Sequence, residues 1–162
     1  MTQTNDIQLV PHFSLNELAG TSVVKFQKKN LEEAKKQMGK MYMLAGFAER
    51  VREIVGYPLI VTSGFRCTGL NNYLGGALIS QHLFCEAIDI VCKKMTVKGM
   101  YNKIKASDLK YDQMIIETNK SGAEWLHISI GSRKQRLQYK DGKYTYLDKG
   151  GHIKWKTQLC ML

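Results

Sequence analysis

One aspartate inside an apolar segment constrains the fold of this chain more than any other residue. Residues 87–91 read Ala-Ile-Asp-Ile-Val and have the composition of a buried β-strand. In a strand, the side chain of Asp89 points away from those of Ile88 and Ile90. Because burying an unpaired carboxylate is costly, the fold has to bring a partner to Asp89.

Two histidines are candidate partners. On a straight helix, the seven residues between His82 and Asp89 would separate them by about 10.5 Å along the axis. Zinc ligands have to reach the metal at about 2.0–2.2 Å, so the two residues share a site only if a turn separates them. His127 lies in a second apolar strand, residues 125–130. Three protein ligands with an open fourth position are typical of catalytic zinc, so these three residues form a candidate site.

Glu124 precedes His127 by three residues. Its carboxylate is a candidate to take a proton from a bound water and to give it to a leaving amine. Each residue also has an ordinary structural interpretation. His127 would be a hydrogen-bonded strand residue and Glu124 a turn residue. Asp89 would form an ion pair with Arg66. The residues alone leave both interpretations open.

Several short motifs resemble those of the zinc D-Ala-D-Ala carboxypeptidase family. This family includes D-Ala-D-Ala dipeptidases, L-Ala-D-Glu endopeptidases and phage endolysins, and it shares its fold with the Hedgehog signalling domain. Residues 80–90 are similar to its S-x-H…A-x-D-[IL] signature. Residues 63–66, 125–129 and 13–18 are similar to its S-G-[YF]-R, W-x-H-[IVL]-S and F-[ST]-L-x-E-[LM] motifs. The matching pieces follow the expected order over residues 12–133.

The resemblance implies an α+β fold of the Hedgehog/DD-peptidase type, with helices packed on an antiparallel sheet that carries the metal site. It implies that His82, Asp89 and His127 bind one zinc ion per chain, although this ligand set also accepts other divalent ions. Some members carry an acid three residues before the last ligand, which makes Glu124 the expected general base. Glu117 is the second candidate.

The resemblance also assigns substrate-binding residues. Arg66 would bind or polarise a substrate carbonyl or carboxylate, and Ser80 and Gln81 would line the cleft. Two positions depart from the family pattern, which usually has glycine at Cys85 and often serine at Cys67. The turn at Cys85 therefore has to tolerate a side chain, or has a different form.

Local signals predict the remaining elements. Capping boxes predict one helix after Ser14 and a second over residues 31–55, capped by Asn30. Thr96 is expected to cap a third helix. Glycines and asparagines in residues 68–76 predict a loop. Further strands are predicted at residues 59–62 and 113–117, and a hairpin at Asp141-Gly142.

The 162 residues, 44% of them hydrophobic, predict a single domain over residues 1–162, with residues 134–162 as a basic extension of unknown role. No apolar window is long enough for a membrane span. The polar N-terminus lacks a signal-peptide pattern, so we expect synthesis in the cytoplasm and action on the cell wall only after release or transport by a virion. The four cysteines form no CxxC pair, which argues against a cysteine-only zinc site and favours reduced thiols.

The net charge of +10 is concentrated near the C-terminus, where residues 132–162 hold eight Lys or Arg and two Asp. Such a segment attracts polyanions, such as nucleic acid, an anionic membrane or a cell-wall polymer, or is simply a solvated surface. No motif for specific base recognition is present.

The leading hypothesis is a zinc peptidase that cuts peptidoglycan stem peptides, of the D-Ala-D-Ala carboxypeptidase or endopeptidase type, which fits a phage lysis or virion enzyme. The alternative is a catalytically inactive module on the same fold that binds cell wall or protein. Nucleic-acid binding through the basic tail is a third hypothesis. The bond that is cut and the oligomeric state stay open.

Overall fold

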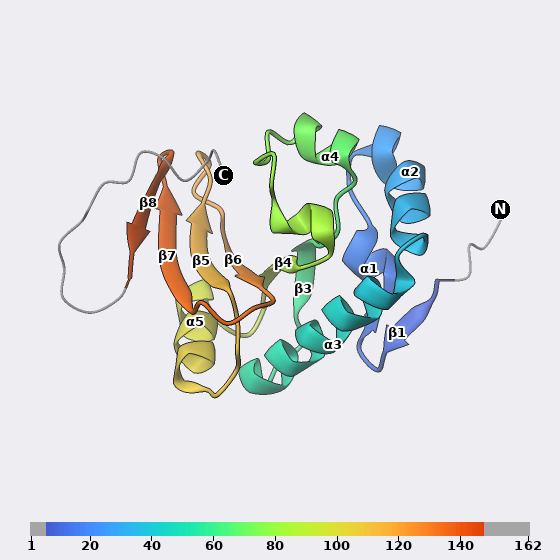
Figure 1. The fold of residues 1–162 in the computed structure, drawn as a ribbon. Coiled ribbons are helices and arrows are strands. Elements are labelled where there is room, and N and C mark those ends of the chain that lie inside the picture. Colours follow the sequence, from blue (N-terminus) through green and yellow to red (C-terminus); the bar gives the residue numbers. More distant parts are fainter. Residues whose placement is uncertain (1–5, 148–162) are drawn as a thin grey trace.

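The computed structural model describes residues 6–147. Cys160 and most of the predicted basic extension lie outside the described residues. Figure 1 shows α1 to α3 gathered beside one edge of a six-stranded sheet, with β7 and β8 at the other edge. Within residues 6–147, no helix combines the length and the apolar composition that crossing a bilayer requires.

Within residues 6–147, five α-helices and one 3₁₀ helix form the helical part. They are α1 (Leu15–Ala19), α2 (Val24–Lys35), α3 (Met38–Val55), α4 (Thr68–Tyr73), the 3₁₀ helix η1 (Gln81–Phe84) and α5 (Val97–Ala106). Two short strands, β1 (Gln8–Val10) and β2 (Phe13–Ser14), pair beside α3.

The large sheet has the order β3-β4-β6-β5-β7-β8. Its strands are β3 (Ile60–Ser63), β4 (Ala87–Val91), β5 (Gln113–Thr118), β6 (Glu124–Ser129), β7 (Gln135–Lys140) and β8 (Lys143–Tyr146). The expected α+β class is confirmed, but the sheet is mixed rather than antiparallel, because β7 runs parallel to β5. The chain leaves β6, passes the end of β5 and returns on its far side, so that β7 takes the direction of β5.

The two faces of the sheet differ in chemistry. One face presents aliphatic side chains that are fully or almost fully buried and share one core with α3 and α5. The other face carries Asp89 and His127, which lie directly opposite each other on β4 and β6. The strand alternation read from the sequence thus separates the core from the candidate site. The aliphatic set is Ile88, Ile90, Met114, Ile116, Leu126 and Ile128.

Asn30 does not cap a helix as predicted. It is fully buried inside α2, which begins at Val24, and α3 begins separately at Met38. The Asn30 amide donates to the carbonyls of Ala19 (2.7 Å) and Phe65 (2.9 Å), and its oxygen accepts from the Cys67 N–H (2.6 Å). The side-chain amide thus forms hydrogen bonds with three backbone groups that are distant in sequence, and it does not cap the start of a helix.

The predicted loop over residues 68–76 is wrong for its first part, which forms α4. The other local predictions are confirmed. Ser14 forms the capping box of α1 with Glu17, and the Thr96 side chain caps α5. The β7–β8 turn places Asp141 and Gly142 at φ of 52° and 77°, as an Asp-Gly hairpin requires.

Cys85 ends η1 in the left-handed conformation, with φ 59° and ψ 37°. This backbone is strained for any residue with a Cβ, which explains why the family pattern has glycine at this position. The Cys85 side chain is buried, and burial raises the pKa of its thiol to about 11. The turn therefore keeps its form and accommodates cysteine.

We expect Cys85→Gly to unfold with a free energy about 0.5–1 kcal/mol higher than Cys85→Ala, because glycine relieves the left-handed strain that alanine retains. Urea denaturation of both variants measures the difference. The control pair is Asn102→Gly and Asn102→Ala, at an exposed position of α5, where glycine should be the less stable by about 1 kcal/mol. The same order of stability at both positions would contradict the explanation.

Candidate metal centre

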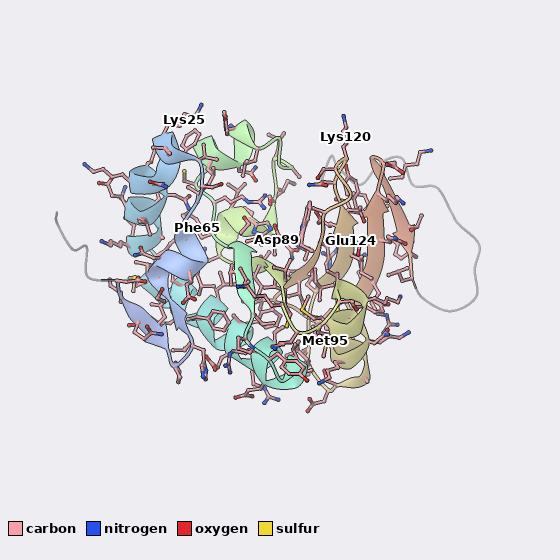
Figure 2. All side chains as sticks on the ribbon, turned by 180° about the vertical axis from the view of Figure 1, so that it is seen from behind. Lys25, Phe65, Asp89, Met95, Lys120 and Glu124 are labelled. Atoms are coloured by element: carbon pink, nitrogen blue, oxygen red, sulfur yellow. The ribbon has the colours of Figure 1, made fainter. Side chains whose placement is uncertain are left out.

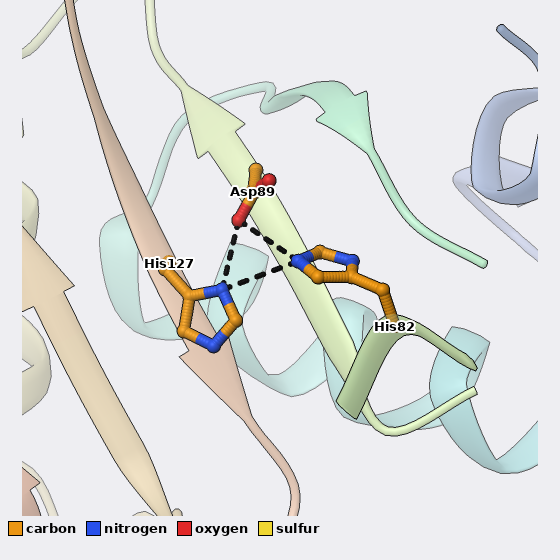
Figure 3. A group of neighbouring side chains, drawn as sticks. All are labelled: His82, Asp89 and His127. Atoms are coloured by element: carbon orange, nitrogen blue, oxygen red, sulfur yellow. Dashed lines mark hydrogen bonds and ion pairs between the residues drawn. The ribbon is translucent and has the colours of Figure 1, made fainter. Parts of the chain in front are cut away.

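Three side chains from three different elements point toward one another (Figure 3). His82 comes from η1, Asp89 from β4 and His127 from β6. Each is at least 93% buried. The 3₁₀ helix and the turn at Cys85 fold His82 back onto the strand that holds Asp89. The structure therefore brings together the three residues that were predicted from the sequence as metal ligands.

The ligand atoms form a compact triangle. His82 Nε2 lies 3.3 Å from His127 Nδ1 and 3.3 Å from Asp89 Oδ1, and His127 Nδ1 lies 2.9 Å from Asp89 Oδ1. Tetrahedral ligands at about 2.0–2.2 Å from zinc lie roughly 3.3–3.6 Å from one another. Two of the distances match this value and the third is a few tenths of an ångström short. Among the described residues, this group of His and Asp side chains has the spacing to hold one metal ion.

Outer hydrogen bonds orient the ligands. His82 Nδ1 lies 2.7 Å from the Gly64 carbonyl, which only accepts, so the proton is on Nδ1 and the lone pair of Nε2 faces the centre. Arg66 Nη2 donates to Asp89 Oδ2 at 2.8 Å, which leaves Oδ1 toward the histidines. The Asp89–Arg66 ion pair considered as an alternative is present and leaves the ligand oxygen available.

Gly64 is required by this arrangement. A Cβ on Gly64 would lie 2.1 Å from the carbonyl oxygen of Leu18 in α1. The close approach allows the Phe65 N–H to donate to that carbonyl at 2.7 Å. Glycine in the Ser-Gly-Phe-Arg motif thus fixes the backbone that orients both His82 and Arg66.

The charges of the centre favour a cation. Burial alone would raise the pKa of Asp89, but the two histidines hold it well below its usual range. Burial lowers the pKa of His82, so this ligand stays neutral. Burial also opposes protonation of His127, but the hydrogen bond to Asp89 and the negative charges of Asp89 and Glu117 together outweigh it and raise the pKa of His127. Zinc has to displace that proton, so its affinity should fall as the pH is lowered through the range of histidine titration.

The two candidate bases lie in different places. Glu124, labelled in Figure 2, begins β6 and alternates onto the face opposite to that of His127. It is exposed and accepts from the Thr118 hydroxyl at 3.3 Å. Glu117 lies opposite Trp125, on the same face as His127. Burial raises the pKa of Glu117, which also senses the charges of His127, Asp89 and Arg66. The structure places Glu117, rather than Glu124, beside the metal centre.

Strand pairing, which a single sequence does not specify, decides this placement. Counting by two along β5 puts Glu117 on the face of Ile115, but only the pairing of Ile115 with His127 puts that face at the metal. Glu117 and His127 are ten residues apart in the sequence, and this spacing does not by itself predict that they lie close together.

A cleft of about 280 Å³ opens beside the metal centre and contains Arg66 and Asp89. Arg66 uses Nη2 for Asp89 and Nε for the Ser63 hydroxyl, two of its five donors, and the hydrogen bonds within residues 6–147 leave the others for a substrate. The other lining residues are Gly20, Thr21, Ser22, Val23, Thr62, Ser63, Phe65, Leu70, Leu74 and Trp125.

Ser80 and Gln81, the other predicted substrate-binding residues, do not line this cleft. Ser80 precedes η1, and the Gln81 amide donates to Asp112 at 2.9 Å. Asp112 also accepts two hydrogen bonds from Arg133. Gln81 thus anchors η1, and with it His82, to the start of β5.

A model of the family described as Peptidase M15 matches residues 11–129. The match contains all three candidate ligands together with Arg66, Glu117 and Glu124. No curated protein matches the chain.

We expect the purified protein to contain about one zinc ion per chain and His82→Ala to contain none, because two remaining ligands leave the cation poorly held. Elemental mass spectrometry after dialysis measures the content. His12→Ala is the matched control, since His12 is exposed and pairs with Glu49 at the surface. Stoichiometric zinc in His82→Ala would show that the ion binds elsewhere.

Proposed function

Because the chain belongs to the Peptidase M15 family of zinc metallopeptidases, we propose that it hydrolyses peptide bonds of bacterial peptidoglycan stem peptides. The observation that carries the proposal is the buried triangle of His82 Nε2, Asp89 Oδ1 and His127 Nδ1 at the edge of an open cleft. The reaction is of the D-Ala-D-Ala carboxypeptidase or endopeptidase type.

The residues around the triangle have complementary roles. A zinc ion bound there supplies a Lewis acid that polarises a carbonyl and acidifies water. Glu117 accepts the proton of the attacking water on its carboxylate and passes it to the nitrogen of the leaving amine. Its raised pKa brings the carboxylate closer to the working pH than an exposed glutamate would be. Arg66 holds a carboxylate or carbonyl oxygen of the substrate in the cleft.

The cleft supports a substrate with small side chains. Its lining includes the hydroxyl residues Thr62 and Ser63, the apolar residues Leu70 and Leu74, and Arg66. A terminal alanine offers a methyl group to the apolar surface and a carboxylate to the arginine. The net charge of +10 favours approach to an anionic cell wall, as expected for a phage lysis or virion enzyme.

We expect Glu117→Gln to lower kcat on stem peptides by roughly a hundred- to ten-thousand-fold, the usual contribution of a positioned base, while zinc content is retained. Glu124→Gln is the matched control and should keep the wild-type rate within about twofold, because its carboxylate is on the other face of the sheet. Initial rates at saturating pentapeptide measure both. If Glu124→Gln loses activity and Glu117→Gln keeps it, the assignment of the base is reversed.

The type of bond is identified from the products. The wild-type protein with zinc is incubated with the stem pentapeptide and with purified peptidoglycan, and the products are analysed by mass spectrometry. Free D-alanine indicates a carboxypeptidase, and cleavage inside the stem or cross-link indicates an endopeptidase. Zinc binding without any product on either substrate would favour the alternative, an inactive module that binds cell wall or protein.

A further inference from the structure

The β7–β8 hairpin follows the residues that match the family, and its two faces differ in chemistry. Strand alternation puts Leu137, Tyr139, Tyr144 and Tyr146 on one face. The other face carries Gln138, Lys140, Lys143 and Thr145. A hairpin of this composition normally turns its apolar face to the helix-covered core.

Here the apolar face is turned the other way. Tyr139 lies opposite Glu117 of β5, and Leu137 lies opposite Ile115. Ile115 in turn lies opposite His127 of β6. Directly paired residues share a face, so the aromatic face of the hairpin continues the face that carries the metal centre. The polar face of the hairpin continues the face that packs on α5.

Two of the tyrosine rings remain half exposed. Tyr139 and Tyr144 are cross-strand partners with ring centroids 4.6 Å apart, a contact that stabilises the hairpin. Tyr144 and Tyr146 nevertheless keep 45% and 52% of their surfaces exposed. Tyrosine offers rigid, amphipathic contact area at low cost in conformational entropy, and exposed apolar surface of this kind is typical of binding sites.

The distance from His127 to these rings is close to the length of an extended stem peptide. Adjacent strands lie about 4.7–4.9 Å apart, so β8 lies roughly 14 Å across the sheet from β6 and His127. An extended peptide advances about 3.3–3.6 Å per residue, so four residues span roughly the same distance. The Arg66 cleft lies on the opposite side of His127, toward β3, where it suits the carboxyl end of the peptide.

We propose that Tyr144 and Tyr146 bind the glycan strand to which the stem peptide is attached. The proposal rests on the proposed function. The amino end of the stem is linked to a sugar, and a peptide with its carboxyl end at Arg66 places that sugar over the hairpin. A pyranose ring presents C–H groups to the face of a tyrosine ring, and its hydroxyl groups remain available to the phenolic oxygens.

The first test compares the free stem pentapeptide with the same peptide on its disaccharide. For the wild-type protein, kcat/KM should be roughly tenfold higher for the disaccharide-linked peptide, a factor equivalent to about 1.4 kcal/mol. Tyr146→Ala should lose most of this preference and keep the wild-type rate on the free peptide. Tyr146→Phe should retain most of it, because the ring face is preserved and only the phenolic oxygen is lost. Thr145→Ala, on the other face of β8, is the matched control and should behave as wild type.

Equal kcat/KM of the wild-type protein on both substrates would overturn the proposal. An equal loss of Tyr146→Ala on both substrates would also overturn it, because the tyrosine would then contact the peptide or only support the fold. Binding of peptide-free glycan strands, measured by calorimetry, separates this proposal from the proposed function. Binding that Tyr146→Ala weakens supports the glycan site even if no peptide is cut, and absence of binding to the wild-type protein overturns it.

Discussion

The arrangement of this protein depends on the buried carboxylate of Asp89. Only 5% of this residue is exposed, and its two oxygens are divided between a cation on one side and two imidazoles on the other. Removing one partner of a buried charge leaves the other uncompensated at a high cost in stability. The elements that carry these groups, β3 with the turn after it, η1, β4 and β6, therefore have to meet at this point. The metal centre and part of the stability of the fold come from the same set of contacts.

The register of the sheet sets the positions of the residues around the metal centre. Neighbouring strands place residues in direct register, so one row runs from Asp89 through His127 and Ile115 to Leu137 and Tyr146. The parallel pairing of β7 with β5 keeps the hairpin on the same row. A change of register by one residue would turn Glu117 and the tyrosines to the helix-covered face. The chemistry of the site thus depends on strand order and register as much as on the identity of the residues.

Interactions between neighbours in sequence were predicted well. The capping box of Ser14 and Glu17, the strand around Asp89 and the Asp-Gly hairpin depend on contacts within a few residues, which the sequence records directly. The ligand set followed from an ionisable residue in an apolar strand together with the family motifs. The errors concern residues whose partners are distant. Asn30 has the residue type of a cap but bonds to Ala19, Phe65 and Cys67, and the segment after Cys67 forms a helix despite its glycines and asparagines.

The sequence by itself determined the class of fold, the three metal-binding candidates and the need for a special backbone near Cys85. The first two follow from periodicity and from the cost of burying charge, together with the family motifs, and the third follows from the glycine that the family pattern has at the position of Cys85. Only the tertiary structure decided that Glu117 faces the metal centre, that Gln81 bonds to Asp112 and that the hairpin turns its tyrosines toward the catalytic face. The physical reason is that each of these depends on which strands pair and in what register, and pairing energies are shared among many weak contacts that no single residue reveals.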